Sequence, residues 1–176
     1  FAHDSVNLTL TAYFVMASAA ALTDYPMVNS SMQDAKIILR HGINVGIAVS
    51  LGQNGLIVPV IRDAKDKSLF NIASELNDLT TRAREQRLEA DEVQDGTFTI
   101  TNHGVSGSLM ATPIINQPQC AIMGVGVIQK RAMVIDDSVV IRPMAYLTLS
   151  FDHRIIDGVI ADDFLANVKR IIEAWT

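Results

Sequence analysis

The chain has 176 residues, of which 49% are hydrophobic, enough for one packed domain over residues 1–176. Its formal net charge of -5 and pI near 5.2 argue against the basic surface that binds nucleic acid. A single cysteine excludes an internal disulfide and favours a reducing compartment. The longest apolar stretch, 10–22, is shorter than the roughly 20 residues that cross a membrane, so no membrane partner is expected.

The N-terminal half of the chain predicts two helices and a group of short strands. Apolar residues at helical spacing predict a first helix over 8–22, which stops before Pro26 because proline disfavours a continuing helix. Ser68 is the expected N-cap of a second, amphipathic helix that runs to about Arg87. Pro59 predicts an edge or irregular position for its strand. Strands are expected over 36–41, 43–50 and 56–62, with a turn at 52–55.

The C-terminal half is rich in strands and ends in a helix over 159–175. A short acidic turn of helix is expected at 88–94, and Asp136-Asp137 marks a hairpin turn. The loop over 104–118 is long enough to suggest a functional role. Strands are expected over 97–101, 121–130, 132–135 and 139–150. Because strands and helices do not alternate regularly, we expect an α/β (α+β) fold with a mixed sheet.

The segment Asp152-His153-Arg154-Ile155-Ile156-Asp157-Gly158 places a histidine between an apolar strand and a helix. An imidazole at a strand end can act as a general base, since its unperturbed pKa of about 6.5 is close to neutral pH. Asp157, four residues on, can fix the local geometry. The alternative is a plain strand-to-helix turn with a capping aspartate and a surface histidine, because base catalysis needs a partner in space.

A second segment, 96–104, carries three threonines on a predicted strand. Alternation places Thr97, Thr99 and Thr101 on one face of that strand. Thr101 lies at the strand end, where its hydroxyl can point at a reacting group. The alternative is that the threonines reflect β propensity alone.

Three motifs follow one another along the chain. They are Gly-Thr-Phe-Thr-Ile-Thr-Asn-x-Gly from Gly96, Thr-Pro-Ile-Ile-Asn-Gln-Pro-Gln from Thr112, and Asp-His-Arg-Ile-Ile-Asp-Gly from Asp152. Together they resemble the catalytic domain of dihydrolipoamide acyltransferases, the E2 components of 2-oxo acid dehydrogenase complexes. The resemblance covers almost the whole chain and implies a chloramphenicol-acetyltransferase-like fold.

The resemblance implies direct transfer of an acyl group between dihydrolipoamide and coenzyme A. His153 is then the general base that takes the thiol proton, and Thr101 donates a hydrogen bond to the tetrahedral oxyanion. Asp157 is expected to hold the loop around His153, through an ion pair. Asn102 and Ser150 are candidate residues of the coenzyme A or lipoyl channel.

The family also implies an assembly. The building block would be a homotrimer with active sites between neighbours, His153 from one chain and Thr101 from the next. Trimers would form a 24-mer or 60-mer core, which agrees with a mean hydropathy of +0.25 that is high for a lone domain.

Phe1 is not a natural start, so we expect an N-terminally truncated chain with lipoyl and subunit-binding domains upstream. Those domains would carry the lipoyl group and contact the E1 and E3 components, in the cytoplasm of a bacterium or archaeon, or in the mitochondrial matrix of a eukaryote.

Two other functions stay open: a non-catalytic structural core subunit of the same complex, and a free-standing small-molecule acetyltransferase. The presence of His153, Asp157 and a hydroxyl at position 101 favours catalysis. The resemblance implies an acyl group that is succinyl or branched-chain. Thr101 and the segment 107–119 resemble succinyltransferases, whereas the hairpin and C-terminal end resemble bacterial branched-chain enzymes. We lean slightly to succinyl.

The remaining histidines and charged residues have structural interpretations. His3 and His41 are expected in solvent or in a turn, and His103 occupies the variable position of the Asn-x-Gly step. The four histidines and Cys120 show no metal-ligand spacing. Direct transfer forms no acyl-enzyme, so Cys120 need not be a nucleophile. A solvated helix face is expected for Arg82, Arg84 and Arg87.

Overall fold

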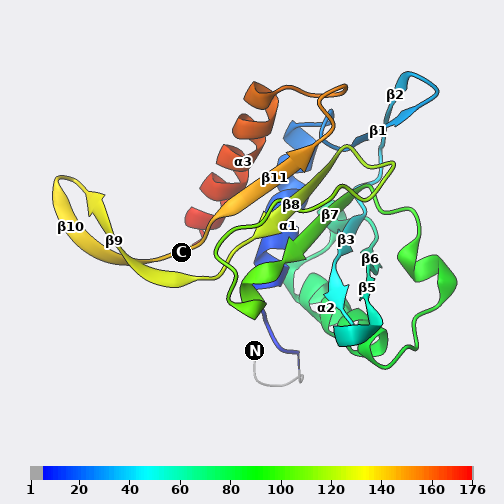
Figure 1. Ribbon diagram of the computed structural model, residues 1–176, viewed down its shortest axis with the longest axis horizontal. Coiled ribbons are helices and arrows are strands. Elements are labelled where there is room, and N and C mark those ends of the chain that lie inside the picture. The colour runs from blue at the N-terminus through cyan, green and yellow to red at the C-terminus, as the bar shows by residue number, and fades with distance from the viewer. Residues whose placement is uncertain (1–5, 176) are drawn as a thin grey trace.

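The computed structural model, which describes residues 6–175, is built around a five-stranded sheet (Figure 1). In spatial order the strands are β11 (Leu147–Phe151), β8 (Ala121–Val125), β7 (Phe98–Asn102), β3 (Val45–Ile47) and β6 (Val60–Ile61). The helices are α1 (Leu10–Asp24), α2 (Leu69–Arg84) and α3 (Gly158–Glu173). β3, β7 and β8 are parallel, whereas β6 and β11 are antiparallel to their neighbours, so the sheet is mixed, as predicted.

Shorter elements flank the central sheet. The two-stranded sheets are β1 (Ser30–Gln33) with β2 (Lys36–Leu39), β4 (Val49–Ser50) with β5 (Leu56–Ile57), and β9 (Gln129–Ile135) with β10 (Ser138–Met144). The 3₁₀ helices are η1 (Gly52–Asn54), η2 (Ala64–Asp66), η3 (Ala90–Val93) and η4 (His103–Ser106). Within residues 6–175, no helix combines the length and the hydropathy that crossing a membrane requires.

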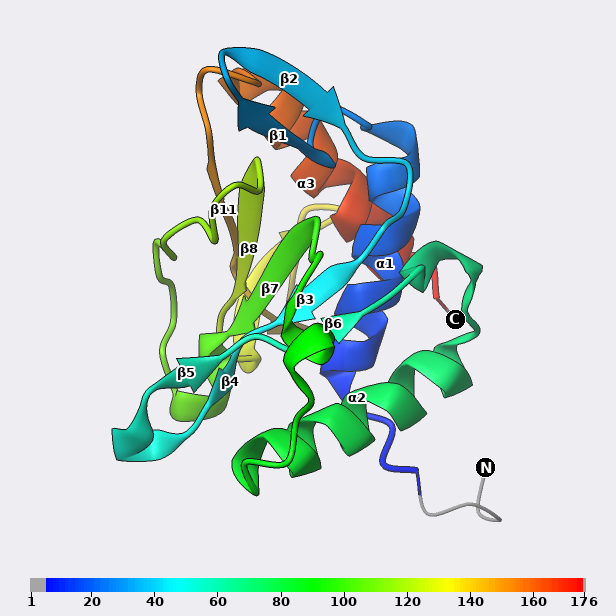
Figure 2. The same ribbon diagram turned by 90° about the vertical axis from the view of Figure 1, so that its right-hand side faces the viewer.

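The core lies between the central sheet and the helices, with α1 and α3 together on one side of the sheet (Figure 2) and buried side chains of α2, such as Ile72 and Leu79, added to it. Phe98 of β7 packs edge-on against Phe164 of α3, with ring centroids 5.5 Å apart. α1 is rich in alanine and is buried on most of its surface, because small side chains let its neighbours approach closely. Full burial of a large apolar side chain stabilises the fold by roughly 1.5–3 kcal/mol, so this packing fixes the position of β7.

Most of the elements predicted for the N-terminal half are confirmed. α1 begins at Leu10, and Ser68 caps α2 by accepting a hydrogen bond from the Asn71 amide at 3.2 Å. Residues on either side of Pro59 form β5 and β6 rather than one strand, and β6 lies at the sheet edge, as the proline predicts. The sequence did not predict β1, whose polar residues lack a strand pattern.

The predicted extents of strands 121–130 and 139–150 are wrong, because the chain leaves the central sheet after β8. A Cβ added at Gly126 would lie 2.1 Å from the Leu109 carbonyl oxygen, so the adjoining loop packs directly on the backbone there. The hairpin β9–β10 projects from the body of the molecule (Figure 1). Its turn is at Asp136 and Asp137, as predicted, where both φ angles are positive, 49° and 57°.

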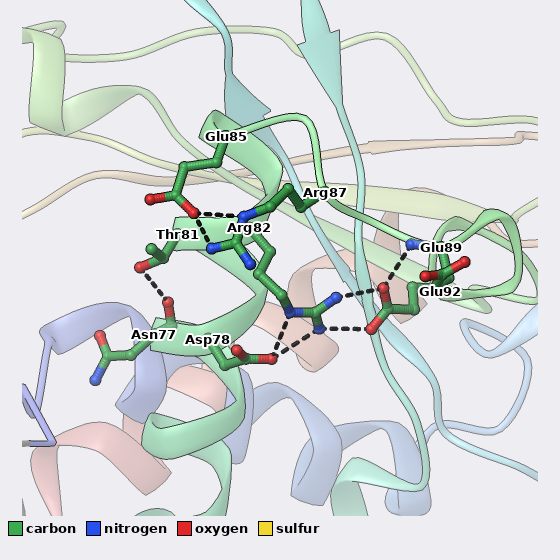
Figure 3. Close-up of polar contacts among 8 residues, drawn as sticks. All are labelled: Asn77, Asp78, Thr81, Arg82, Glu85, Arg87, Glu89 and Glu92. Atoms are coloured by element: carbon green, nitrogen blue, oxygen red, sulfur yellow. Dashed lines mark hydrogen bonds and ion pairs between the residues drawn. The ribbon is translucent and has the colours of Figure 1, made fainter.

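The interpretation of Arg82 as part of a solvated face is wrong, although the other two arginines of that group are exposed. Figure 3 shows its guanidinium between Asp78 of α2 and Glu92 of η3, at nitrogen–oxygen distances of 2.7 and 2.6 Å. Glu92 also accepts a hydrogen bond from the Glu89 amide at 2.8 Å. These contacts fasten η3 to α2 and hold the segment that leads into β7.

This network predicts an acid-sensitive contribution to stability. The hydrogen bonds from Arg82 and from the Glu89 amide lower the pKa of Glu92 from its ordinary value of 4.5 to about 2. A carboxylate with a lowered pKa stabilises the folded state above its unfolded pKa, and that contribution is lost as the pH falls toward the folded value. Urea unfolding should therefore show Glu92→Gln to be less stable than wild type at pH 7, with the difference vanishing near pH 2.

The matched control is Glu85→Gln, because the Glu85–Arg87 pair is exposed and such pairs contribute little. A gap between Glu92→Gln and wild type that stays constant from pH 7 to pH 2 would contradict the assigned ion pair.

Candidate active site

His153 lies in the turn that joins β11 to α3, and its side chain is exposed. Backbone hydrogen bonds fix this turn. The Asp152 amide donates to the Cys120 carbonyl at 2.8 Å, and the Ile155 amide donates to the Asp152 carbonyl at 2.9 Å. The His153 ring lies beside that of Phe151, with centroids 5.4 Å apart. An exposed imidazole on a rigid turn can take a proton from a bound group.

The ion pair of this turn joins Asp152 and Arg154. Arg154 Nε lies 2.9 Å from Asp152 Oδ1, and hydrogen bonds from Arg154 hold the pKa of Asp152 below its ordinary value. Asp157 has no ion pair within residues 6–175, so the contact expected for it is replaced by a helix cap. Its Oδ1 accepts a hydrogen bond from the Ile160 amide at 3.1 Å, and such a cap stabilises a helix by about 1 kcal/mol.

Thr101 lies near the end of β7, on the face of the sheet that is opposite the helices. Because side chains alternate along a strand, Phe98 and Ile100 point into the core while Thr101 points away from it. The register places Thr101 opposite Gly124 of β8, and Gly124 opposite Thr148 of β11. Thr101 is only half-buried, so a neighbouring molecule can reach its hydroxyl.

The two candidate channel residues lie on different strands. Asn102 Nδ2 donates to Thr11 Oγ1 at 3.1 Å, so this side chain contacts α1 on the helix side of the sheet. Ser150 lies opposite Ile122 on β11 and is half-buried. Their places in a substrate channel stay predictions.

His153 and Thr101 lie at opposite ends of the central sheet within one chain. β7 and β11 run in opposite directions, as Figure 1 shows. Thr148 lies two strands across the sheet from Thr101, and each step between strands is about 4.8 Å. Phe151 lies three residues further along β11, at about 3.3 Å per residue. The two strand ends are therefore roughly 14 Å apart, and His153 is two residues beyond Phe151. One chain cannot bring both side chains to the same reacting carbonyl.

Cys120 is buried at the start of β8. Burial raises the pKa of its thiol to about 11, so the thiolate is scarce at neutral pH and the residue is a poor nucleophile. Among residues 6–175, no group of histidine, cysteine, aspartate and glutamate side chains could hold a metal ion. A cavity of about 660 Å³ lies between α1, α3 and the base of the β9–β10 hairpin, but neither His153 nor Thr101 lines it.

Sequence reasoning did not assign Gly124 to the site and gave His103 only a minor role. A Cβ added at Gly124 would lie 2.5 Å from Thr148 Oγ1 and 3.1 Å from His103 Nε2. The only sequence signal was a glycine inside a strand, which marks a close approach by another group.

The chain is similar to known proteins over nearly all of its length. The model of the family described as 2-oxoacid dehydrogenases acyltransferase (catalytic domain) matches residues 1–176. The chain belongs to this family. A relative from Bartonella vinsonii subsp. berkhoffii, the dihydrolipoyllysine-residue succinyltransferase component of a 2-oxoglutarate dehydrogenase complex, is 48% identical over 96% of the chain. The chain spans only 41% of that relative's length.

Solved structures of the same family have the same fold. A probable dihydrolipoamide acetyltransferase from Listeria monocytogenes is 42% identical, with a TM-score of 0.91 over 94% of this chain and 70% of that one. The cubic core of the pyruvate dehydrogenase multienzyme complex is 34% identical, with a TM-score of 0.93 over 97% of this chain and 70% of that one. The same values hold for Azotobacter vinelandii dihydrolipoamide acetyltransferase, studied for the role of a serine, a histidine and an asparagine in catalysis.

Chloramphenicol acetyltransferase has the same fold at greater distance. It is 16% identical, with a TM-score of 0.58 over 93% of this chain and 78% of that one. The predicted fold class and the family resemblance are therefore both confirmed.

Proposed function

We propose that the chain catalyses the transfer of an acyl group between dihydrolipoamide and coenzyme A. The observation that carries the proposal is a residue spacing. The serine, histidine and asparagine studied in the Azotobacter enzyme are separated by 52 and then by 4 residues. In this chain Thr101, His153 and Asp157 have the same two separations. Threonine keeps the hydroxyl of serine, and aspartate keeps the side-chain oxygen that caps α3 here.

The geometry supports direct transfer with His153 as the base. Its imidazole takes the proton of the attacking thiol, and the thiolate adds to the carbonyl carbon of the thioester. The oxyanion that forms accepts a hydrogen bond from the Thr101 hydroxyl. When the intermediate collapses, the carbon–sulfur bond of the donor breaks, and the leaving thiolate takes up the proton from the imidazolium. Cys120 takes no part, because its thiol is buried and protonated.

The separation of Thr101 from His153 within one chain supports an active site between two copies. In a homotrimer, His153 of one chain and Thr101 of the next would meet across each interface. The β9–β10 hairpin carries exposed apolar side chains that suit burial by a neighbour. Among them, Val139 is 75% exposed and Ile141 is 69% exposed in one chain. We further propose a 24-mer or 60-mer core, joined to E1 and E3 through lipoyl and subunit-binding domains, in the cytoplasm of a bacterium or archaeon or in the mitochondrial matrix of a eukaryote.

The acyl group we propose is succinyl. Its support is the name of the Bartonella relative, a succinyltransferase component, which agrees with the threonine at position 101. The runner-up is a branched-chain acyl group.

Acyl transfer to dihydrolipoamide tests both the class of reaction and the acyl group. We expect turnover with succinyl-coenzyme A well above that with acetyl-, isobutyryl- and isovaleryl-coenzyme A. A preference for isobutyryl- or isovaleryl-coenzyme A would keep the class of reaction but overturn the succinyl assignment. No turnover with any donor, in a protein shown to be folded and trimeric or larger, would support a non-catalytic core subunit. Transfer from acetyl-coenzyme A to a small alcohol, with none to dihydrolipoamide, would support a free-standing acetyltransferase.

A further inference from the structure

A second histidine, His103, follows the proposed oxyanion donor by two residues along the chain. It begins η4, directly after the end of β7. Its ring lies over Gly124, since Nε2 is 3.1 Å from the position of an added Cβ there. Gly124 is the residue opposite Thr101 in the register. The imidazole thus occupies the space that a side chain at Gly124 would fill.

The backbone around His103 is held firmly. A Cβ added at the next residue, Gly104, would lie 2.4 Å from the carbonyl carbon and oxygen of Gly126. Thr148 Oγ1, on the other side of Gly124, donates to the Ala111 carbonyl at 2.8 Å and so fastens the following loop over the sheet. The ring of His103 is therefore confined between the strand ends and this loop.

Both ring nitrogens of His103 are shielded from solvent and have no hydrogen-bond partner within residues 6–175. A neutral imidazole carries one N–H donor and one acceptor, and buried polar groups in proteins are usually paired. Two hydroxyl-bearing residues, Thr101 and Thr148, are the register partners of Gly124 on its two sides. The Thr148 hydroxyl already donates to Ala111, whereas the Thr101 hydroxyl makes no hydrogen bond to residues 6–175.

We propose that His103 is a positioning residue for Thr101, whose hydroxyl oxygen accepts a hydrogen bond from the His103 ring N–H during acyl transfer. The inference rests on the proposed function and adds a residue to it. A hydroxyl has one proton and two lone pairs. When the imidazole N–H occupies one lone pair, the hydroxyl proton is directed away from the ring, toward the oxyanion of the neighbouring chain's substrate. Donors oriented in advance stabilise the transition state without a cost of reorganisation.

Two substitutions separate this role from simple packing. His103→Leu fills similar space without a donor, whereas His103→Gln keeps an N–H donor at a similar reach. In acyl transfer from succinyl-coenzyme A by the assembled protein, kcat should fall roughly 10-fold in His103→Leu, the effect of about one hydrogen bond, with KM little changed. His103→Gln should recover most of kcat. The matched controls, His41→Leu and His41→Gln, change an exposed histidine at a distant turn and should have no effect.

A double-mutant cycle tests whether His103 acts through the Thr101 hydroxyl. In the Thr101→Ala background, His103→Leu should cause no further loss of kcat, because the hydroxyl that it positions is already gone. An equal loss in both backgrounds would overturn the proposal, as would equal activity of His103→Leu and wild type. Loss of assembly or of thermal stability in both His103 variants, in proportion to their loss of activity, would also overturn it. Wild-type turnover and its large decrease in His153→Ala, measured in the same assay, report on the proposed function separately.

Discussion

Replacing His153 with alanine is expected to lower turnover by roughly 10²–10⁴, the range that a positioned general base contributes. The side chain is exposed on a turn held by backbone hydrogen bonds, so its removal leaves no cavity and breaks no structural contact beyond the ring of Phe151. Thermal unfolding and the size of the assembly should therefore match those of wild type. Steady-state kinetics with saturating succinyl-coenzyme A and dihydrolipoamide measure the effect.

His41→Ala is the matched control for this substitution, since His41 is also an exposed turn histidine. Its turnover should equal that of wild type. If His153→Ala kept near-full turnover, the assignment of the base would be wrong, and the segment 152–158 would be a structural turn only.

The second large effect is expected at Thr101. Thr101→Ala should lower kcat by roughly 10²–10³, as the loss of one oxyanion donor does, while Thr101→Ser should keep most activity because the hydroxyl remains. The residue is half-buried and its hydroxyl makes no hydrogen bond to residues 6–175, so alanine should cost little stability. Comparable turnover of the alanine and serine variants would show that the hydroxyl is not used.

Mixed assemblies of the two inactive variants test the shared site. His153→Ala chains still carry Thr101, and Thr101→Ala chains still carry His153. In a randomly mixed trimer, an intact His153 meets an intact Thr101 at roughly one site in four. Activity should therefore return toward a quarter of the wild-type value. Recovery requires the site to span two chains, as the separation of about 14 Å between the strand ends predicts. No recovery in mixed trimers verified by mass spectrometry would contradict a site shared between two chains.

Local sequence patterns were sufficient for the elements that depend on neighbouring residues. Pro26 lies just beyond the end of α1, Ser68 caps α2, and Asp136-Asp137 forms the hairpin turn, because each effect arises within a few bonds of the residue concerned. The predicted extents of β8 to β11 were wrong because they depend on contacts with residues that are distant along the chain. The break after β8 depends on Leu109, whose backbone packs against Gly126 from a loop whose path the local pattern does not specify.

The sequence by itself determined the family and the fold class, and it supplied the residues proposed for the site, since the motifs around Thr101 and His153 are contiguous segments. Tertiary structure decided how those residues are arranged. Strand register separates Thr101 from His153 and brings His103 onto Gly124. Register and packing depend on contacts between residues that are distant along the chain, and no local periodicity encodes them.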